Sequence, residues 1–271
     1  MPPRFNVQHA ICYTTSMNWA AQRRLTIVAI LVAVALVILA IILTATLYKA
    51  PSCVDNKQNQ DEVGVDCGGP CPYLCTSQEE EPSTPTPRLL INGAGRVDLV
   101  AQVQNRNSDA AAKDVPYAVK IYDSNLTFVK EVTGYVDLPP RATVPVFIPG
   151  VAYGGQPGMR ASLSIASTSV NWYRVAGDPR IVPKIDVQPP SGTTSAPRVG
   201  VVLSNATLST LTNVRLVAYV RNSLNGNVVA ASATVVPMLA PQGTATAIFT
   251  WNEPFTAGAV SVEVLPVIPL P

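Results

Sequence analysis

The run "RVDLVAQVQN" at residues 96–105 carries the clearest structural pattern in this 271-residue chain. Alternate residues are apolar and would share one face of a strand, while polar side chains would project from the other face. The apolar set is Val97, Leu99, Ala101 and Val103, and the polar set includes Asp98, Gln102 and Gln104. This period of two predicts a strand with one buried face.

The same alternation continues beyond this run. "VPYAVKIYD" at 115–123 repeats it, and turn residues separate the apolar segments. No stretch of this part shows helical periodicity with caps. Further strands are expected near 127–136, 142–149, 159–167 and 170–175. The chain after residue 88 is therefore predicted to be mostly β.

The order of these features recurs in the second half of the chain. "RVGVVLSN" at 198–205 corresponds to the first run, and "VRLVAYVRNSLNGN" at 214–227 to the second. Asn105 precedes Val115 by ten residues, whereas Asn205 precedes Val214 by nine, a difference that a loop tolerates. We expect two β-sandwich domains, 88–178 and 180–271.

A third pair of segments supports the repeat. "DLPPRATVPVFIP" at 137–149 parallels "MLAPQGTATAIFTW" at 238–251, with Phe147 expected to correspond to Phe249. With "VQNRN" and "LSNAT", these segments resemble small bacterial immunoglobulin-like or fibronectin-type-III-like surface domains. That resemblance implies a scaffold or a binding module and brings no catalytic residues.

A long apolar run precedes this β part. Leu25 to Tyr48 is 24 residues without a charge, and as a helix it would extend roughly 36 Å, enough to cross a bilayer core. Arg23 and Arg24 directly precede it, and the first 48 residues contain no acid. The positive-inside rule then predicts a cytoplasmic tail at 1–24, a transmembrane helix at 25–48 and an extracytoplasmic remainder.

Two other interpretations of this run stay open. A cleaved signal peptide has a shorter apolar region, of about 7–15 residues. A lipoprotein signal would use Cys53, but Lys49 and Pro51 fit its consensus poorly, and lipidation would leave three cysteines outside, an odd number. We therefore favour an uncleaved anchor in the cell membrane, with the membrane as one partner.

Four of the five cysteines follow in a short module at 51–75. They are Cys53, Cys67, Cys71 and Cys75. In an oxidising compartment they predict two disulfides, of which the sequence allows three pairings. A zinc site of four thiolates is the alternative, although its usual C-x2-C pairs are absent. The module is followed by a linker at 76–87 that is rich in Pro, Ser, Thr and Glu and predicts an extended stalk.

The module also resembles a cysteine motif of secreted and surface proteins of bacteria, C-x-D-x-x-x-N-x-x-E-x-G-V-D-C-G-G-x-C-x-x-x-C. Its polar positions are Asp55, Asn59, Glu62 and Asp66. Their oxygens would suit calcium, but the spacing lacks the central glycine and final glutamate of an EF-hand. The alternative is that these side chains hold backbone amides in a disulfide-bonded loop. We expect no other cofactor.

Several function classes are disfavoured by composition. The one histidine, His9, lies in the predicted cytoplasmic tail, so no Ser–His–Asp or Cys–His catalysis is expected outside. Residues 49–271 hold 16 basic and 17 acidic residues, a net charge of −1, which disfavours nucleic acid. No acids are spaced as a glycosidase pair.

The predicted architecture is therefore an N-terminal transmembrane helix, a small disulfide-rich module and two tandem Ig-like β-sandwiches. We expect a structural or adhesive surface protein with protein partners or glycans, and not an enzyme. The alternative is an accessory subunit of a membrane-bound secretion, pilus or transport complex. The sequence does not predict whether the chain forms homo-oligomers.

Overall fold

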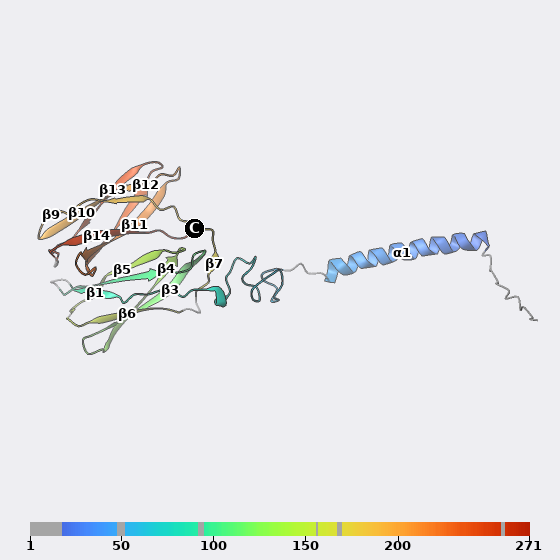
Figure 1. Cartoon of the computed structure of the whole chain (residues 1–271), viewed down its shortest axis with the longest axis horizontal. Coiled ribbons are helices and arrows are strands. Elements are labelled where there is room, and N and C mark those ends of the chain that lie inside the picture. The colour runs from blue at the N-terminus through green and yellow to red at the C-terminus, as the bar shows by residue number, and fades with distance from the viewer. Residues whose placement is uncertain (1–17, 48–51, 92–94, 156, 167–169, 256–257) are drawn as a thin grey trace, which may run out of the picture. The chain divides into compact units, whose positions relative to one another are not determined.

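The computed structural model describes residues 18–47, 52–91, 95–155, 157–166, 170–255 and 258–271 (Figure 1). The chain divides into two compact units, Met1–Ser52 and Cys53–Pro271, and each is described by itself.

The first unit contains helix α1, Trp19–Leu47. It begins before the predicted span and includes Arg23 and Arg24, while Tyr48 lies outside the described residues. The guanidinium of Arg23 lies 4.3 Å from the ring centroid of Trp19, which makes a cation–π contact. The hydroxyls of Thr26, Thr44 and Thr46 donate to carbonyls one turn back. These hydroxyl donors are thus satisfied within the helix itself.

The first sandwich has two antiparallel sheets. One has the order β1-β2-β5, formed by Arg88–Ile91, Val97–Gln104 and Thr143–Ala152. The other has the order β4-β3-β6, formed by Phe128–Leu138, Ala110–Tyr122 and Arg160–Ile165. A short strand β7, Tyr173–Arg174, also pairs with β3. The expected apolar face of β2 is confirmed, because Val97, Leu99, Ala101 and Val103 are all buried in the core.

The second sandwich repeats this arrangement. Its first sheet has the order β8-β10-β13, formed by Lys184–Val187, Ala196–Ser204 and Thr244–Thr250, with β9 (Ser191–Thr193) paired to β10. Its second sheet has the order β12-β11-β14, formed by Val228–Leu239, Leu211–Asn222 and Val260–Val267. Strand for strand, the orders match those of the first sandwich. The mostly β fold with two antiparallel sandwiches is confirmed.

A buried asparagine occupies the same place in each sandwich. The Asn105 amide donates to the carbonyls of Ala110, Leu138 and Pro139. In the second sandwich the Asn205 amide donates to the carbonyls of Ser209, Leu239 and Ala240. Each side chain thereby joins the end of one strand to the following loop and to a distant turn. This geometry explains why the asparagine occurs in both halves together with an L-x-P turn, which reads "LPP" at 138–140 and "LAP" at 239–241.

A β-bulge accounts for the spacing difference between the halves. In β3 the register against β4 shifts between Ala112 and Val115, so one extra residue is accommodated there. No such shift occurs at the corresponding end of β11. The extra residue is therefore inside a strand, and not in the loop where it was expected from the sequence.

The predicted equivalence of Phe147 and Phe249 is wrong by one residue. Phe249 pairs with Val199 and points into the second sandwich, whereas Phe147 pairs with Val100 and points out of the first. The true counterpart of Phe249 is Ile148, which packs against the first core. A slip of one residue moves a side chain to the opposite face of a strand, so the error reverses the role of Phe147.

The two sandwiches pack against each other through these outward faces. Val100 and Phe147 from the first sandwich form a buried cluster with Val217, Tyr219 and other residues of the second. The Tyr219 hydroxyl donates a hydrogen bond of 3.0 Å to the carbonyl of Ala101. The sheet β1-β2-β5 thus faces its own core on one side and the sheet β12-β11-β14 on the other.

The segment 76–87 is extended, as its composition predicts, but it does not stand apart as a stalk. A 3-10 turn spans Thr76–Gln78, and the main chain of Ser83 then pairs with Gln104 at the end of β2. The Asn107 side chain bonds both the N–H and the carbonyl of Glu80. These contacts hold the segment along the first sandwich. Polar backbone groups that a free linker would leave to water are bonded here instead.

Tyr219→Phe tests the contact between the sandwiches. The substitution keeps the ring but leaves the buried Ala101 carbonyl without this donor, so we expect a loss of about 1–2 kcal/mol in the free energy of unfolding. Urea unfolding measures it. Tyr135→Phe is the matched control, because the Tyr135 side chain is exposed. Equal effects of the two substitutions would contradict the assigned role.

Tyr219 also predicts that the free energy of unfolding depends on pH in the alkaline range. Burial raises the pKa of Tyr219 above its ordinary value of 10.0, because the folded state favours the neutral phenol. Its stabilising effect is complete below the unfolded pKa and declines as the pH rises above it. The free energy of unfolding should therefore fall above pH 10.0. Tyr219→Phe should make that fall shallower in urea titrations across this range.

Candidate functional site

The cysteine module contains two interleaved disulfides. Cys53 bonds Cys71, with Cα atoms 5.6 Å apart, and Cys67 bonds Cys75, with Cα atoms 5.0 Å apart. The structure therefore selects one of the three pairings that the sequence allowed. All four sulfurs are used, so they form neither the alternative zinc site nor a free thiol for lipidation at Cys53.

The four polar motif residues hold the backbone of this module. The Asp66 carboxylate accepts the N–H groups of Asp55 and Asn56, each at 2.9 Å. The buried Glu62 carboxylate accepts the N–H groups of Asn59 and Asp66 at 3.1 and 3.3 Å. The Asn59 amide donates to Asp55. These contacts support the backbone-holding role that the sequence left as the alternative to calcium.

The glycine pair of the motif allows this loop to close tightly. Gly69 has a φ of +56°, and a Cβ atom there would lie 2.2 Å from the Asp61 carbonyl oxygen. Asp61 and Asp66 also have positive φ, which aspartate tolerates better than most residues. The motif therefore specifies a backbone path as well as the cysteines.

One buried oxygen of the module has no partner among the described residues, the Oδ1 atom of Asn59. Glu62 Oε1 lies 3.1 Å from Cys71 Sγ, which has no hydrogen to donate because it belongs to a disulfide. Calcium coordination by Asp55 or Asp66 would compete with the amide contacts above. Calcium binding stays a prediction.

Residues 72–74 of the cysteine module contact the first sandwich. The Leu74 N–H donates to the Trp172 carbonyl at 3.0 Å, and the Arg174 N–H donates to the Pro72 carbonyl at 2.7 Å. Tyr73 and Tyr173 form a β-bridge, and Leu74 packs against the sandwich core. The module is thus joined to the first sandwich by backbone pairing. Of the two adjacent aromatics 172 and 173, the tryptophan is the buried one.

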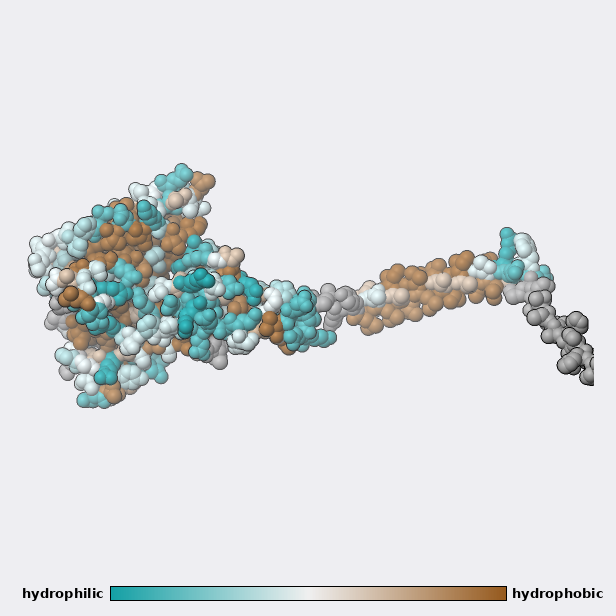
Figure 2. All heavy atoms as spheres, viewed as in Figure 1, coloured by the Kyte–Doolittle hydropathy of each residue, from teal (hydrophilic) through white to brown (hydrophobic). Residues whose placement is uncertain are grey.

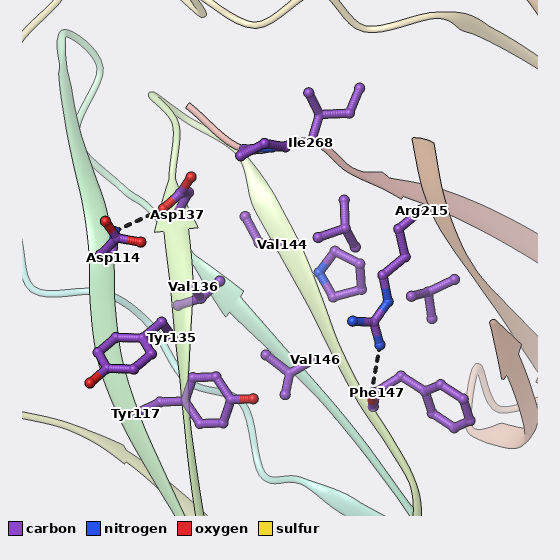
Figure 3. A pocket seen from close by; sticks show the side chains of 14 residues that line it. Asp114, Tyr117, Tyr135, Val136, Asp137, Val144, Val146, Phe147, Arg215 and Ile268 are labelled. Carbon is purple, nitrogen blue, oxygen red and sulfur yellow. Dashed lines mark hydrogen bonds between the residues drawn. The ribbon is translucent and has the colours of Figure 1, made fainter. Parts of the chain in front are cut away.

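A cavity of about 260 Å³ lies between the sandwiches (Figure 3). Tyr117 reaches into it from β3, and Arg215 reaches into it from the second sandwich. The Tyr117 ring lies close over Gly134 of the neighbouring strand, where a Cβ atom would lie 2.4 Å from the hydroxyl. Burial raises the pKa of Tyr117, and the nearby Arg215 partly offsets that shift. Arg215 also donates to the Phe147 carbonyl at 3.4 Å.

The acidic end of this cavity holds residues 268–271 against the first sandwich. Asp137 accepts the N–H of Asp114 through one oxygen and the N–H of Leu270 through the other, at 2.8 and 2.7 Å. The Leu270 side chain is buried. The charged residues that line the cavity are Asp114, Asp137 and Arg215. The polar groups here join the sandwiches.

A larger cleft of about 430 Å³ lies elsewhere along the same interface. Trp251 and Phe255 form one wall, with ring centroids 5.2 Å apart. Arg96 and Asp98 form an ion pair of 2.8 Å on another wall. The Trp251 indole N–H donates to the Ala231 carbonyl at 3.2 Å. Aromatic surface beside a few polar groups is typical of a ligand cleft.

Comparisons with known proteins identify no family. No family model matches the chain, and no curated protein matches it. A red sea bream transglutaminase structure aligns with 67% of this chain at 14% identity and a TM-score of 0.26. The CBM22-1–CBM22-2 tandem domain of Paenibacillus barcinonensis Xyn10C aligns with 72% of it at 11% identity and a TM-score of 0.14.

The alignments cover 29% of the transglutaminase chain and 86% of the tandem domain. Likeness at these TM-scores carries no functional argument. The chain is a mostly β protein with one N-terminal apolar helix, two disulfides and antiparallel sandwiches, and its function has to be argued from its own residues.

Sequence reasoning missed the residues that join the sandwiches. Val217 and Tyr219 alternate with Leu216 and Ala218, and all four are buried. The uninterrupted apolar run 216–220 is typical of a strand buried on both faces. This run was the sequence signal that could have predicted the contact between the sandwiches. The contact of Trp19 with Arg23, one turn further along α1, was likewise missed.

Asp66→Asn tests the backbone-holding role. Asparagine tolerates the same backbone conformation but accepts through one oxygen only, so one amide loses its partner. A loss of about 1.5 kcal/mol would make local opening, and hence reduction of the Cys53–Cys71 disulfide by dithiothreitol, about tenfold faster. Mass spectrometry of alkylated protein measures the rate. Asp61→Asn, at an exposed position with a similar φ, should leave it unchanged.

Calcium titration of the oxidised full-length chain tests the ion prediction separately. Binding through the motif carboxylates should give a calorimetric dissociation constant below the millimolar range, and Asp66→Asn should weaken it. A flat titration would remove the calcium prediction and leave the amide contacts as the role of these residues.

Proposed function

We propose that the chain is a single-pass, membrane-anchored extracytoplasmic protein with a structural or adhesive role. The observation that carries the proposal is the sequence order of an apolar helix, a disulfide-bonded module and paired β-sandwiches. The helix α1 is long and apolar enough to cross a membrane, and no residue of it is buried by protein. Disulfides persist in extracytoplasmic compartments, which supports placing the module and sandwiches there.

The proposed orientation has the N-terminus in the cytoplasm. Arg23 and Arg24 lie near the beginning of α1, and the last turn of the helix contains no basic residue. This asymmetry supports the orientation through the positive-inside rule. The prokaryotic character and the immunoglobulin-like assignment of the sandwiches are part of the same proposal and rest on the motif resemblances.

Rigid display of surface is the role that the contacts support best. The module pairs with the first sandwich, and the first sandwich packs on the second through Val100, Phe147 and Tyr219. Interfaces that bury an apolar cluster restrict relative motion more than a flexible linker does. The protein would therefore present its second unit as one body.

In the adhesive form of the proposal, ligands bind in the larger cleft. Trp251 and Phe255 would pack on an apolar face, and Arg96 and Asp98 would bond polar groups of a glycan or a protein. We propose no enzymatic activity and no nucleic-acid binding. The support is the placement of the one histidine at position 9 and the near-neutral charge of residues 49–271.

A second candidate is an accessory subunit that binds a membrane complex through α1. The full exposure of this helix in the structure is the observation that favours it. Affinity purification of the full-length chain separates the two candidates when it is compared with the released unit 53–271. Partners retained only by the full-length chain would favour the accessory subunit, whereas cell or glycan binding by the unit alone would favour the adhesive role.

Thiol labelling of intact cells tests the topology. Four of the five cysteines are in disulfides, so Cys12 is the one cysteine left to label. We expect a membrane-impermeant maleimide to modify Cys12 only after lysis. Labelling before lysis would reverse the proposed orientation, and Cys12→Ser is the control for background labelling.

A further inference from the structure

The β12 strand forms one edge of the second sandwich and differs in composition from a protected edge. It is 12 residues long and contains no charged side chain, and the whole segment from Val228 to Trp251 also has none. Edge strands of soluble proteins usually carry charges that prevent pairing with other chains. The absence of charge over this length therefore needs an explanation.

The first sandwich supplies an internal comparison. β4 occupies the same position as β12 in its sheet, and it carries Lys130 and Glu131. The registers of β4 and β12 against β3 and β11 align Thr133 with Ala233 and Tyr135 with Val235. Two edges with the same topology thus differ in charge, so the fold itself does not require the uncharged edge.

The main chain of β12 directs hydrogen-bonding groups to its outer side, away from β11. The Ala231 carbonyl accepts the Trp251 indole N–H, so it points away from β11. Residues at two-residue intervals point the same way, which adds Ala233 and Val235. Pro237 falls at the same spacing, where its missing N–H costs no bond to β11. Among the described residues, no strand pairs with this side of β12.

Exposed apolar side chains accompany these groups. Val235, Met238 and Ile248 of β12 and β13 are 51%, 65% and 58% exposed. Figure 2 shows hydrophobic residues gathered in the region where Figure 1 places β12 and β13. The edge also continues from the contact between the sandwiches, where Val228 and Ala231 are buried.

We propose that this edge is a self-association site at which β12 pairs antiparallel with β12 of a second copy. Pairing centred on Ala233 lets that residue exchange two main-chain hydrogen bonds with its counterpart, because residues opposite each other in a hydrogen-bonded pair do so. An uncharged strand meets its own copy without like-charge repulsion. The contact is two-fold symmetric and closes as a dimer. The Trp251 indole, which bonds the Ala231 carbonyl, and Pro237 limit the pairing to the residues around Ala233 that lie between them.

The choice of a second copy as the partner rests on the absence of charge from β12 and on the continuity of this edge with the contact between the sandwiches. A strand that recognised a charged partner segment would be expected to carry complementary charges, and β12 has none. The inference stands on the edge strands and does not depend on the anchoring of the chain in a membrane.

Site-specific cross-linking of the full-length chain tests the pairing. In a Cys12→Ser background, Ala233→Cys places two thiols on residues whose Cα atoms would lie about 5.5 Å apart, within the range of a disulfide. Thr133→Cys on β4 is the matched control at the equivalent position. Expressing cells are treated with a mild oxidant, and their total protein is analysed on non-reducing gels.

We expect covalent dimer from Ala233→Cys at a level about tenfold above Thr133→Cys, because only the first position brings two copies within disulfide distance. Adding Val235→Lys should reduce it to the control level, since the pairing would place a charged side chain opposite Ala231 of the second copy, and edge-strand charges of this kind oppose pairing. Circular dichroism verifies that the Lys variant folds. Equal dimer from both positions, persistence of dimer with Val235→Lys, or cross-linking of Ala233→Cys to a different protein would each overturn the proposal.

Discussion

A buried side-chain amide at the end of one strand organises each sandwich. Asn105 and Asn205 each donate to one nearby carbonyl and to two adjacent carbonyls that lie 33–35 residues further along the chain, and each oxygen accepts a backbone N–H two residues on. Burying an amide without such partners would be costly, so the surrounding turns have to adopt this geometry. The two sheets of each sandwich are thereby held together where the chain crosses between them.

That constraint orients the outer faces on which the proposed function depends. With the core faces of β2 and β11 fixed, Val100 and Tyr219 must point outward, and they meet in the contact between the sandwiches. The same alternation directs the main-chain groups of Ala233 and Val235 in β12 away from β11. The proposed display of a rigid surface and the proposed self-association at the β12 edge both rest on this strand geometry.

Much of this arrangement was predictable from local patterns. Alternation in "RVDLVAQVQN" predicted the buried face of β2, and the repeated asparagine and L-x-P turn predicted a second copy of the same fold. The Phe147 equivalence failed because similar letters were aligned one residue away from the register set by Asn105 and Asn205. The stalk at 76–87 failed as a separate element because composition does not reveal that Ser83 pairs with the end of β2 and that Glu80 bonds the Asn107 side chain in the loop that follows.

The sequence by itself determined the apolar helix, the strand alternation, the duplication and the grouping of four cysteines, since each depends on spacing within a short segment. The tertiary structure alone decided which cysteines pair, how the motif carboxylates hold amides, and which outward residues are buried between sandwiches. Those features depend on groups distant in the chain coming within a few ångströms. Hydrogen bonds and apolar contacts have that short range, so only the folded chain specifies them.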